Sequence, residues 1–108
     1  MKSLYIEDAP NFIQATSPLI IDVREDDEWE EGYIPGAIHV ALSQLPFAIQ
    51  GVEFQKEQPV IFYCKGGVRS AKVIEFLSQN YLKDYQLYNL EGGITEWAAH
   101  NNQVVMPE

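Results

Sequence analysis

The chain has 108 residues, of which 46% are hydrophobic, so residues 1–108 can form one domain with a compact core but not two. Its formal net charge of −9 disfavours a nucleic-acid-binding protein, because contacts to phosphates need a surplus of Lys and Arg. No apolar run approaches the roughly 20 residues that span a bilayer, and the acidic start is unlike a secretory signal, so we expect a cytoplasmic protein without membrane contact. From its size alone we expect a monomer.

Helical patterns and short apolar runs alternate from the N-terminus. Asp8 is expected to cap a first helix that carries Pro10 in its opening turn. Residues 19–23 are apolar apart from Asp22 and rich in β-branched side chains, which is typical of a strand buried on both faces of a parallel sheet. Residues 25–31 contain six acidic residues, which we interpret as a solvated helix face, with an acidic docking surface for a basic partner as the alternative.

The second half of the chain continues this alternation. The longest predicted helix presents Ala71, Ile74, Leu77 and Tyr81 on one face. The predicted elements are, in order, a strand over 37–41, a helix capped by Ser43 and carrying Pro46, a buried strand over 60–64, helix 69–81, a strand over 85–89 and a helix over 94–100. Such spacing predicts an α/β sandwich around a largely parallel sheet.

The only cysteine, Cys64, ends the second buried strand. A single cysteine excludes an internal disulfide and a cysteine-based metal cluster. Taken alone, a free cysteine is more often a small buried apolar residue than a nucleophile. Because ligands of parallel α/β sheets bind beyond the carboxyl ends of the strands, the residues after Cys64 decide between these two interpretations.

The segment after Cys64 favours a nucleophile. Its paired glycines allow backbone N–H groups to converge on one point, and the following helix directs its positive dipole end there. Lys65, Arg69 and Lys72 add positive charge, and such surroundings lower a thiol pKa and would bind an anionic persulfide or sulfur donor. The alternative is a structural cysteine followed by an ordinary Gly-Gly turn. The candidate substrate-binding residues are Lys65, Gly66, Gly67, Val68, Arg69 and Ser70.

Four segments together resemble the signatures of the rhodanese family, in the family's order. They are Asp22–Glu25, Glu28–Trp29 with Gly32–Ala37, Cys64–Ser70, and Leu90–Gly93 with Trp97. The resemblance implies a three-layer α/β sandwich, in which helices cover both faces of a five-stranded, mainly parallel sheet. It also implies a sulfurtransferase without metal or organic cofactor.

In the implied reaction, Cys64 takes sulfur from a small anionic donor such as thiosulfate and carries it as a persulfide. Cyanide in an assay, or a thiol or protein acceptor in the cell, then removes it. Asp22 and Arg24 are expected to support the loop as a structural pair. The positions where two-domain thiosulfate sulfurtransferases carry basic residues hold Glu28 and Gly66, which makes thiosulfate a less secure donor than the persulfide itself.

Two other classes of function stay open. One is a catalytically silent interaction or redox-sensing module of the same fold. The other is a phosphatase or arsenate reductase. Related phosphatases have one residue more between the cysteine and the arginine, whereas four residues separate Cys64 from Arg69 here, so the smaller loop favours a single sulfur atom over a phosphoryl group.

Overall fold

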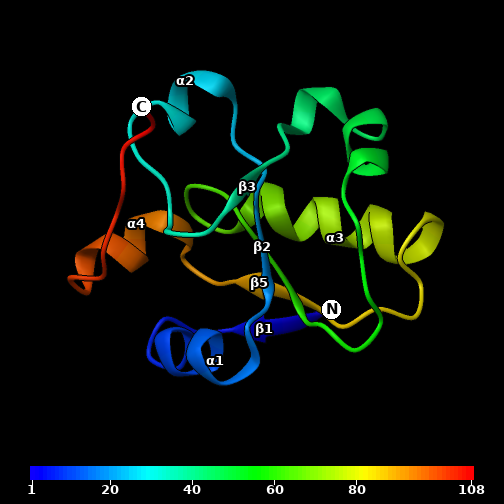
Figure 1. The fold of residues 1–108 in the computed structure, drawn as a ribbon, viewed down its shortest axis with the longest axis horizontal. Coiled ribbons are helices and arrows are strands. Elements are labelled where there is room, and N and C mark those ends of the chain that lie inside the picture. The colour runs from blue at the N-terminus through cyan, green and yellow to red at the C-terminus, as the bar shows by residue number, and fades with distance from the viewer.

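The computed structural model describes residues 1–108 as a five-stranded sheet between two layers of helices (Figure 1). All strand pairs are parallel, and the strand order is β1-β5-β4-β2-β3. The elements are β1 (Lys2–Leu4), α1 (Ala9–Thr16), β2 (Leu19–Asp22), α2 (Asp26–Trp29), β3 (Ile38–His39), the 3₁₀ helices η1 (Leu42–Gln44) and η2 (Phe47–Gly51), β4 (Val60–Tyr63), α3 (Val68–Asn80), β5 (Leu87–Leu90) and α4 (Gly93–Ala99). The predicted α/β architecture is therefore confirmed.

The central strands are buried on both faces because their side chains alternate between two cores. Phe62 of β4 packs with α3 and η2, whereas its neighbours Ile61 and Tyr63 pack with α1 and α4. Strand β2 alternates in the same way, with Ile21 in the first core and Ile20 in the second. Strand β4 lies between β2 and β5, so the residue that follows it, Cys64, lies at the middle of the sheet's carboxyl edge.

Several local predictions differ from the structure. The helix expected after Ser43 is replaced by η1 and η2, and Ser43 does not cap a helix but binds the Glu25 carboxylate through its backbone N–H and its hydroxyl. Asp8 precedes α1 as expected, but its side chain makes no capping hydrogen bond. The buried face of α3 includes Ser70 and Val73, whereas Tyr81, predicted on that face, is exposed.

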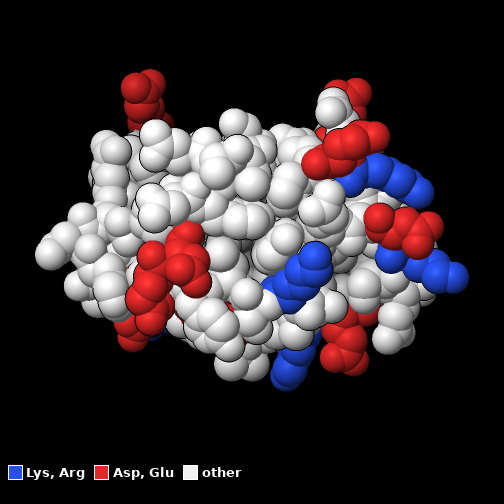
Figure 2. Space-filling view, turned by 90° about the horizontal axis from the view of Figure 1, so that it is seen from below, with Lys and Arg blue, Asp and Glu red and all other residues white.

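The acidic run also differs from the prediction. Only Asp26–Trp29 is helical, and the run is not simply a solvated face, because Glu25 and Glu28 bind other parts of the chain. On the face of the molecule seen in Figure 2, acidic side chains lie in separate groups between uncharged ones rather than in one continuous patch. No helix combines the length and the apolar composition needed to cross a membrane.

Candidate active site

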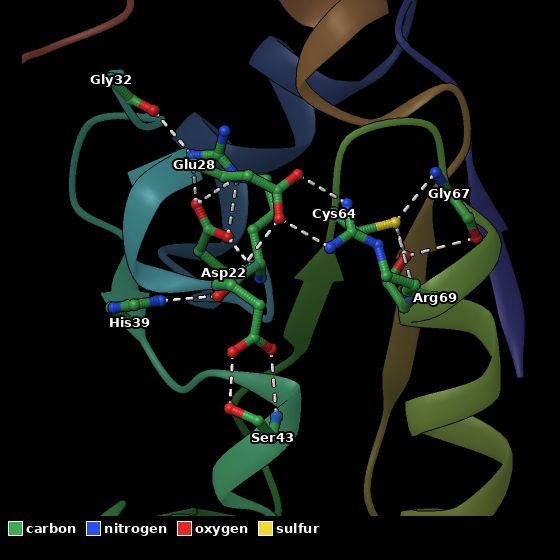
Figure 3. Close-up of polar contacts among 11 residues, drawn as sticks. Asp22, Glu28, Gly32, His39, Ser43, Cys64, Gly67 and Arg69 are labelled. Carbon is green, nitrogen blue, oxygen red and sulfur yellow. Dashed lines mark hydrogen bonds and ion pairs between the residues drawn. The ribbon is translucent and has the colours of Figure 1, made fainter. Parts of the chain in front are cut away.

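The Cys64 sulfur lies at the base of the loop of residues 64–67 between β4 and α3, together with the first turn of α3 (Figure 3). The N–H groups of Gly67 and Ser70 point at Sγ, at 3.1 and 3.4 Å. Gly67 has a φ of +103°, a left-handed conformation that glycine adopts without steric cost. The convergence of backbone N–H groups predicted from Gly66-Gly67 is therefore present, and Cys64 itself is only 1% exposed.

Helix α4 supports this loop from behind. The N–H groups of Ile94 and Thr95, in its first turn, donate to the carbonyl oxygens of Cys64 and Lys65 at 3.0 and 3.1 Å. Gly93 makes this approach possible, because a Cβ on Gly93 would collide with both carbonyl oxygens. Gly93, the second glycine of the last sequence signature, thus allows α4 to pack against the loop that carries the sulfur.

The Ser70 hydroxyl contacts the sulfur and belongs to a buried polar network. Its Oγ lies 3.4 Å from Cys64 Sγ and 2.6 Å from Oδ1 of Asn89, on β5. The Asn89 amide nitrogen donates to the Gly67 carbonyl at 3.1 Å and to the Glu91 carboxylate at 3.0 Å, which fixes the orientation of the amide. The single Ser70 hydroxyl proton therefore has three possible acceptors, Asn89 Oδ1, the Gly67 carbonyl at 3.3 Å and Cys64 Sγ.

Burial and hydrogen bonding act on the Cys64 thiol in opposite directions. Burial raises the pKa of Cys64, but hydrogen bonds from the Ser70 hydroxyl and from the N–H groups of Ser70, Gly67 and Gly66 lower it, and the net pKa is below the ordinary value. The local field therefore favours a thiolate, which is the nucleophilic form of cysteine.

The sequence suggested that Arg69 presents a free positive charge to the sulfur, but in the structure this charge is paired. Its two terminal nitrogens bind both carboxylate oxygens of Glu28 at 2.7 and 2.8 Å (Figure 3). The hydrogen bond from Arg69 lowers the pKa of Glu28 to about 2, and Glu28 in turn raises the pKa of Arg69. The positive surroundings of Cys64 thus come from backbone N–H groups more than from Arg69.

Asp22 and Arg24 form a buried ion pair at the carboxyl end of β2. The Arg24 guanidinium binds Asp22 Oδ2 at 2.7 Å and the Gly32 carbonyl at 2.6 Å. Nε2 of His39 donates to the Arg24 carbonyl at 2.7 Å. Trp29 stacks on both His39 and Tyr33, with ring centroids 4.8 and 3.8 Å away. These contacts position α2, and with it Glu28.

The backbone of Cys64–Ser70 thus curves around the sulfur. The side chains of Lys65, Val68 and Lys72 are exposed and face solvent. The sequence analysis missed Asn89 as a site residue, and it named Glu28 only as a departure from the family pattern, without its pairing with Arg69. A signal for Asn89 exists, since it is a polar residue within an otherwise apolar strand. Nowhere do three or more His, Cys, Asp or Glu side chains come together in a group that could hold a metal ion.

A pocket of about 270 Å³ opens beside the loop, between α2 and α4. Its lining includes both carboxylates and cationic groups, so it presents no uniformly positive surface. The charged lining residues are Arg24, Glu28, Glu31 and Lys65.

Comparison with known proteins identifies the family of this chain. Residues 6–100 match the sequence model of the rhodanese-like domain. A proposed sulfurtransferase of Bacillus subtilis, YtwF, is 36% identical over 78 residues, which cover 72% of this chain and 71% of that protein. The tRNA uridine(34) hydroxylase of Yersinia pestis is 33% identical over 93 residues, which cover 82% of this chain and 26% of the hydroxylase. This chain therefore spans about a quarter of that relative.

Solved structures agree with the sequence match. The crystal structure of a rhodanese-like domain protein from Staphylococcus aureus has a TM-score of 0.81 to this chain at 33% identity, with 100% of both chains covered. The match of residues 6–100, the B. subtilis relative and this fold together show that the chain belongs to the rhodanese-like domain family.

Proposed function

We propose that this chain is a sulfurtransferase that carries a sulfane sulfur as a persulfide on Cys64. The observation that carries the proposal is the convergence of the Gly67 and Ser70 N–H groups on a buried Sγ with a lowered pKa. Such an arrangement stabilises a thiolate before the reaction and an anionic outer sulfur after it. The relationship to a proposed sulfurtransferase of B. subtilis supports the same conclusion.

The reaction takes place in two displacements. In the first, the Cys64 thiolate attacks the outer sulfur of a donor such as thiosulfate, the S–S bond of the donor breaks, and sulfite leaves with the bonding electron pair. In the second, a nucleophilic acceptor attacks the outer sulfur of the persulfide and the Cys64 thiolate leaves. Cyanide as acceptor yields thiocyanate, and a thiol acceptor yields a new persulfide after loss of its proton.

The residues around Cys64 have distinct roles in this proposal. The loop from Lys65 to Ser70 binds the transferred sulfur through its N–H groups, and the hydrogen bonds that lower the pKa of Cys64 favour its thiolate form. The Asp22–Arg24 pair supports the loop by fixing the neighbouring strand end. The proposal includes a cytoplasmic location, where a free thiol such as Cys64 stays reduced, and a thiol or protein partner as acceptor.

The direct test is the intact mass of the protein after incubation with thiosulfate or an organic thiosulfonate. We expect a gain of one sulfur atom that cyanide removes as thiocyanate. Cys64→Ser is the matched variant, because it changes one atom at the site and removes the only thiol, and it should gain no mass.

Other outcomes would point to the other classes of function. A wild-type chain that gains no sulfur from any donor would contradict the proposal and favour a silent interaction or redox-sensing module. Release of phosphate from an aryl phosphate, lost in Cys64→Ser, would instead favour a phosphatase.

A further inference from the structure

We propose that Glu28 sets the charge of the sulfur donor, so that the site favours a singly charged organic thiosulfonate or persulfide over doubly charged thiosulfate. This inference rests on the proposed sulfurtransferase function. It concerns Arg69, the only arginine of the segment Cys64–Ser70, and whether its positive charge is available to a donor.

The first step is the geometry of the Arg69–Glu28 pair. Both terminal nitrogens of Arg69 are bound by both oxygens of Glu28, at 2.7 and 2.8 Å. Bidentate pairs of this kind are strong and hold the planar guanidinium in one orientation. The side chains are 33% and 23% exposed, so water competes for them only in part. A donor anion therefore meets a neutral pair rather than a free arginine.

The second step is that Glu28 is held in place independently of Arg69. Its Oε1 also accepts the backbone N–H of Glu25 at 3.1 Å, which closes a capping box at the start of α2. The Glu25 carboxylate is itself bound by Ser43. The Glu28 carboxylate is thus held from two sides, by Arg69 and by the Glu25 N–H.

The third step is the charge that remains for the donor. The N–H groups of the loop suit one anionic sulfur. The neighbouring pocket is lined by two carboxylates, Glu28 and Glu31, and by two cationic side chains, Arg24 and Lys65, so it offers no surplus of positive charge. The second negative charge of thiosulfate lies on the sulfonate that leaves as sulfite. The Arg69 charge that could offset it is already bound by Glu28, whereas an organic thiosulfonate lacks this second charge. In that case the leaving group is a sulfinate of single charge.

The test compares two donors on the same protein preparations. The value of kcat/KM is measured for thiosulfate and for methanethiosulfonate, with cyanide as acceptor and thiocyanate as product. Glu28→Gln keeps an oxygen for the Glu25 N–H and removes the charge. We expect the ratio of kcat/KM for thiosulfate to that for methanethiosulfonate to rise about tenfold, mainly through a lower KM for thiosulfate.

Asp27→Asn is the matched control. It makes the same change in net charge one residue away, at an exposed carboxylate that has no hydrogen bond or ion pair, and it should leave the ratio unchanged. Both values of kcat/KM are measured on one preparation, so an unfolded fraction lowers them equally and leaves their ratio unchanged.

An unchanged or lowered ratio in Glu28→Gln, or an equal rise in Asp27→Asn, would overturn the inference. Neither result affects the proposed function, which fails only if the wild-type chain gains sulfur from neither donor.

Discussion

Ser70 is the one side chain whose hydroxyl contacts the Cys64 sulfur, and its hydrogen bonds are shared. The short 2.6 Å bond to Asn89 and the 3.4 Å contact to Sγ compete for a single proton. When the sulfur is ionised, its negative charge makes it the stronger acceptor and draws that proton towards it. The hydroxyl therefore stabilises the thiolate more than the thiol.

Removal of this hydroxyl should weaken the thiolate. In Ser70→Ala we expect the pKa of Cys64 to rise, because one hydrogen bond that lowers it is lost while burial still raises it. The thiolate absorbance in the ultraviolet, followed against pH, measures this change, since Cys64 is the only thiol. Ser78→Ala removes a serine from the far end of the same helix and should leave the titration unchanged. An identical titration in wild type and Ser70→Ala would refute this account.

At the level of elements, α4 and the Cys64 loop form one unit. The first N–H groups of α4 bind the carbonyl oxygens of Cys64 and Lys65, and the absence of a side chain on Gly93 allows the contact. The loop geometry therefore depends on a helix that follows it by almost thirty residues.

Gly93→Ala should separate this helix from the loop. The added Cβ would collide with two backbone carbonyls, and the φ of +58° is unfavourable for alanine, so we expect the free energy of unfolding to fall by roughly 2 kcal/mol or more. Urea denaturation measures the loss. Gly51→Ala is the control, because its Cβ would meet no atom within 4 Å, and it should change stability by less than about 1 kcal/mol. Equal stability of the two variants would contradict this role of Gly93.

The elements differ in how far the sequence could predict them. The strands over 19–23 and 60–64 were predicted because both faces of β2 and β4 are buried, which leaves a run that is apolar throughout in β4 and apart from Asp22 in β2. Strand β1 was missed because it has only three residues, and two of them are exposed. The helix expected after Ser43 was wrong, because Ser43 binds Glu25, 18 residues earlier, and local patterns do not contain such a contact.

Contacts between residues distant in the sequence also limit the prediction of the site. The placement of Cys64 beyond a central strand and the glycine turn after it depend on local sequence and could be anticipated. The partners of Arg69 and Ser70, which are Glu28 and Asn89, lie 41 and 19 residues away. The Arg69 charge therefore looked free in the sequence, although the folded chain pairs it.

At the scale of the whole molecule, Glu28 links the site to the pH dependence of the free energy of unfolding. The pKa of Glu28 is about 2 in the folded chain and 4.5 without the fold. A carboxylate with a lowered pKa contributes its full stability above its unfolded pKa, and this contribution is lost as the pH falls towards the folded pKa.

Wild type should therefore be more stable than Glu28→Gln by about 1–3 kcal/mol at neutral pH, and this difference should shrink between pH 4.5 and about 2. The measurement is the free energy of urea unfolding at a series of pH values. Asp27→Asn carries the same change in net charge and should follow the wild-type curve. A constant difference between wild type and Glu28→Gln across this pH range would exclude the linkage.

The single buried cysteine has a consequence for the lifetime of the loaded protein. With no second thiol in this chain, the persulfide proposed on Cys64 cannot be resolved by an internal partner into a disulfide and free sulfide. Cys64 is only 1% exposed in the structure, which would shield the inner sulfur of the proposed persulfide more than the outer one. In the proposed reaction the chain would keep its sulfur until an external acceptor arrives, so the supply of that acceptor would determine how long the sulfur is stored.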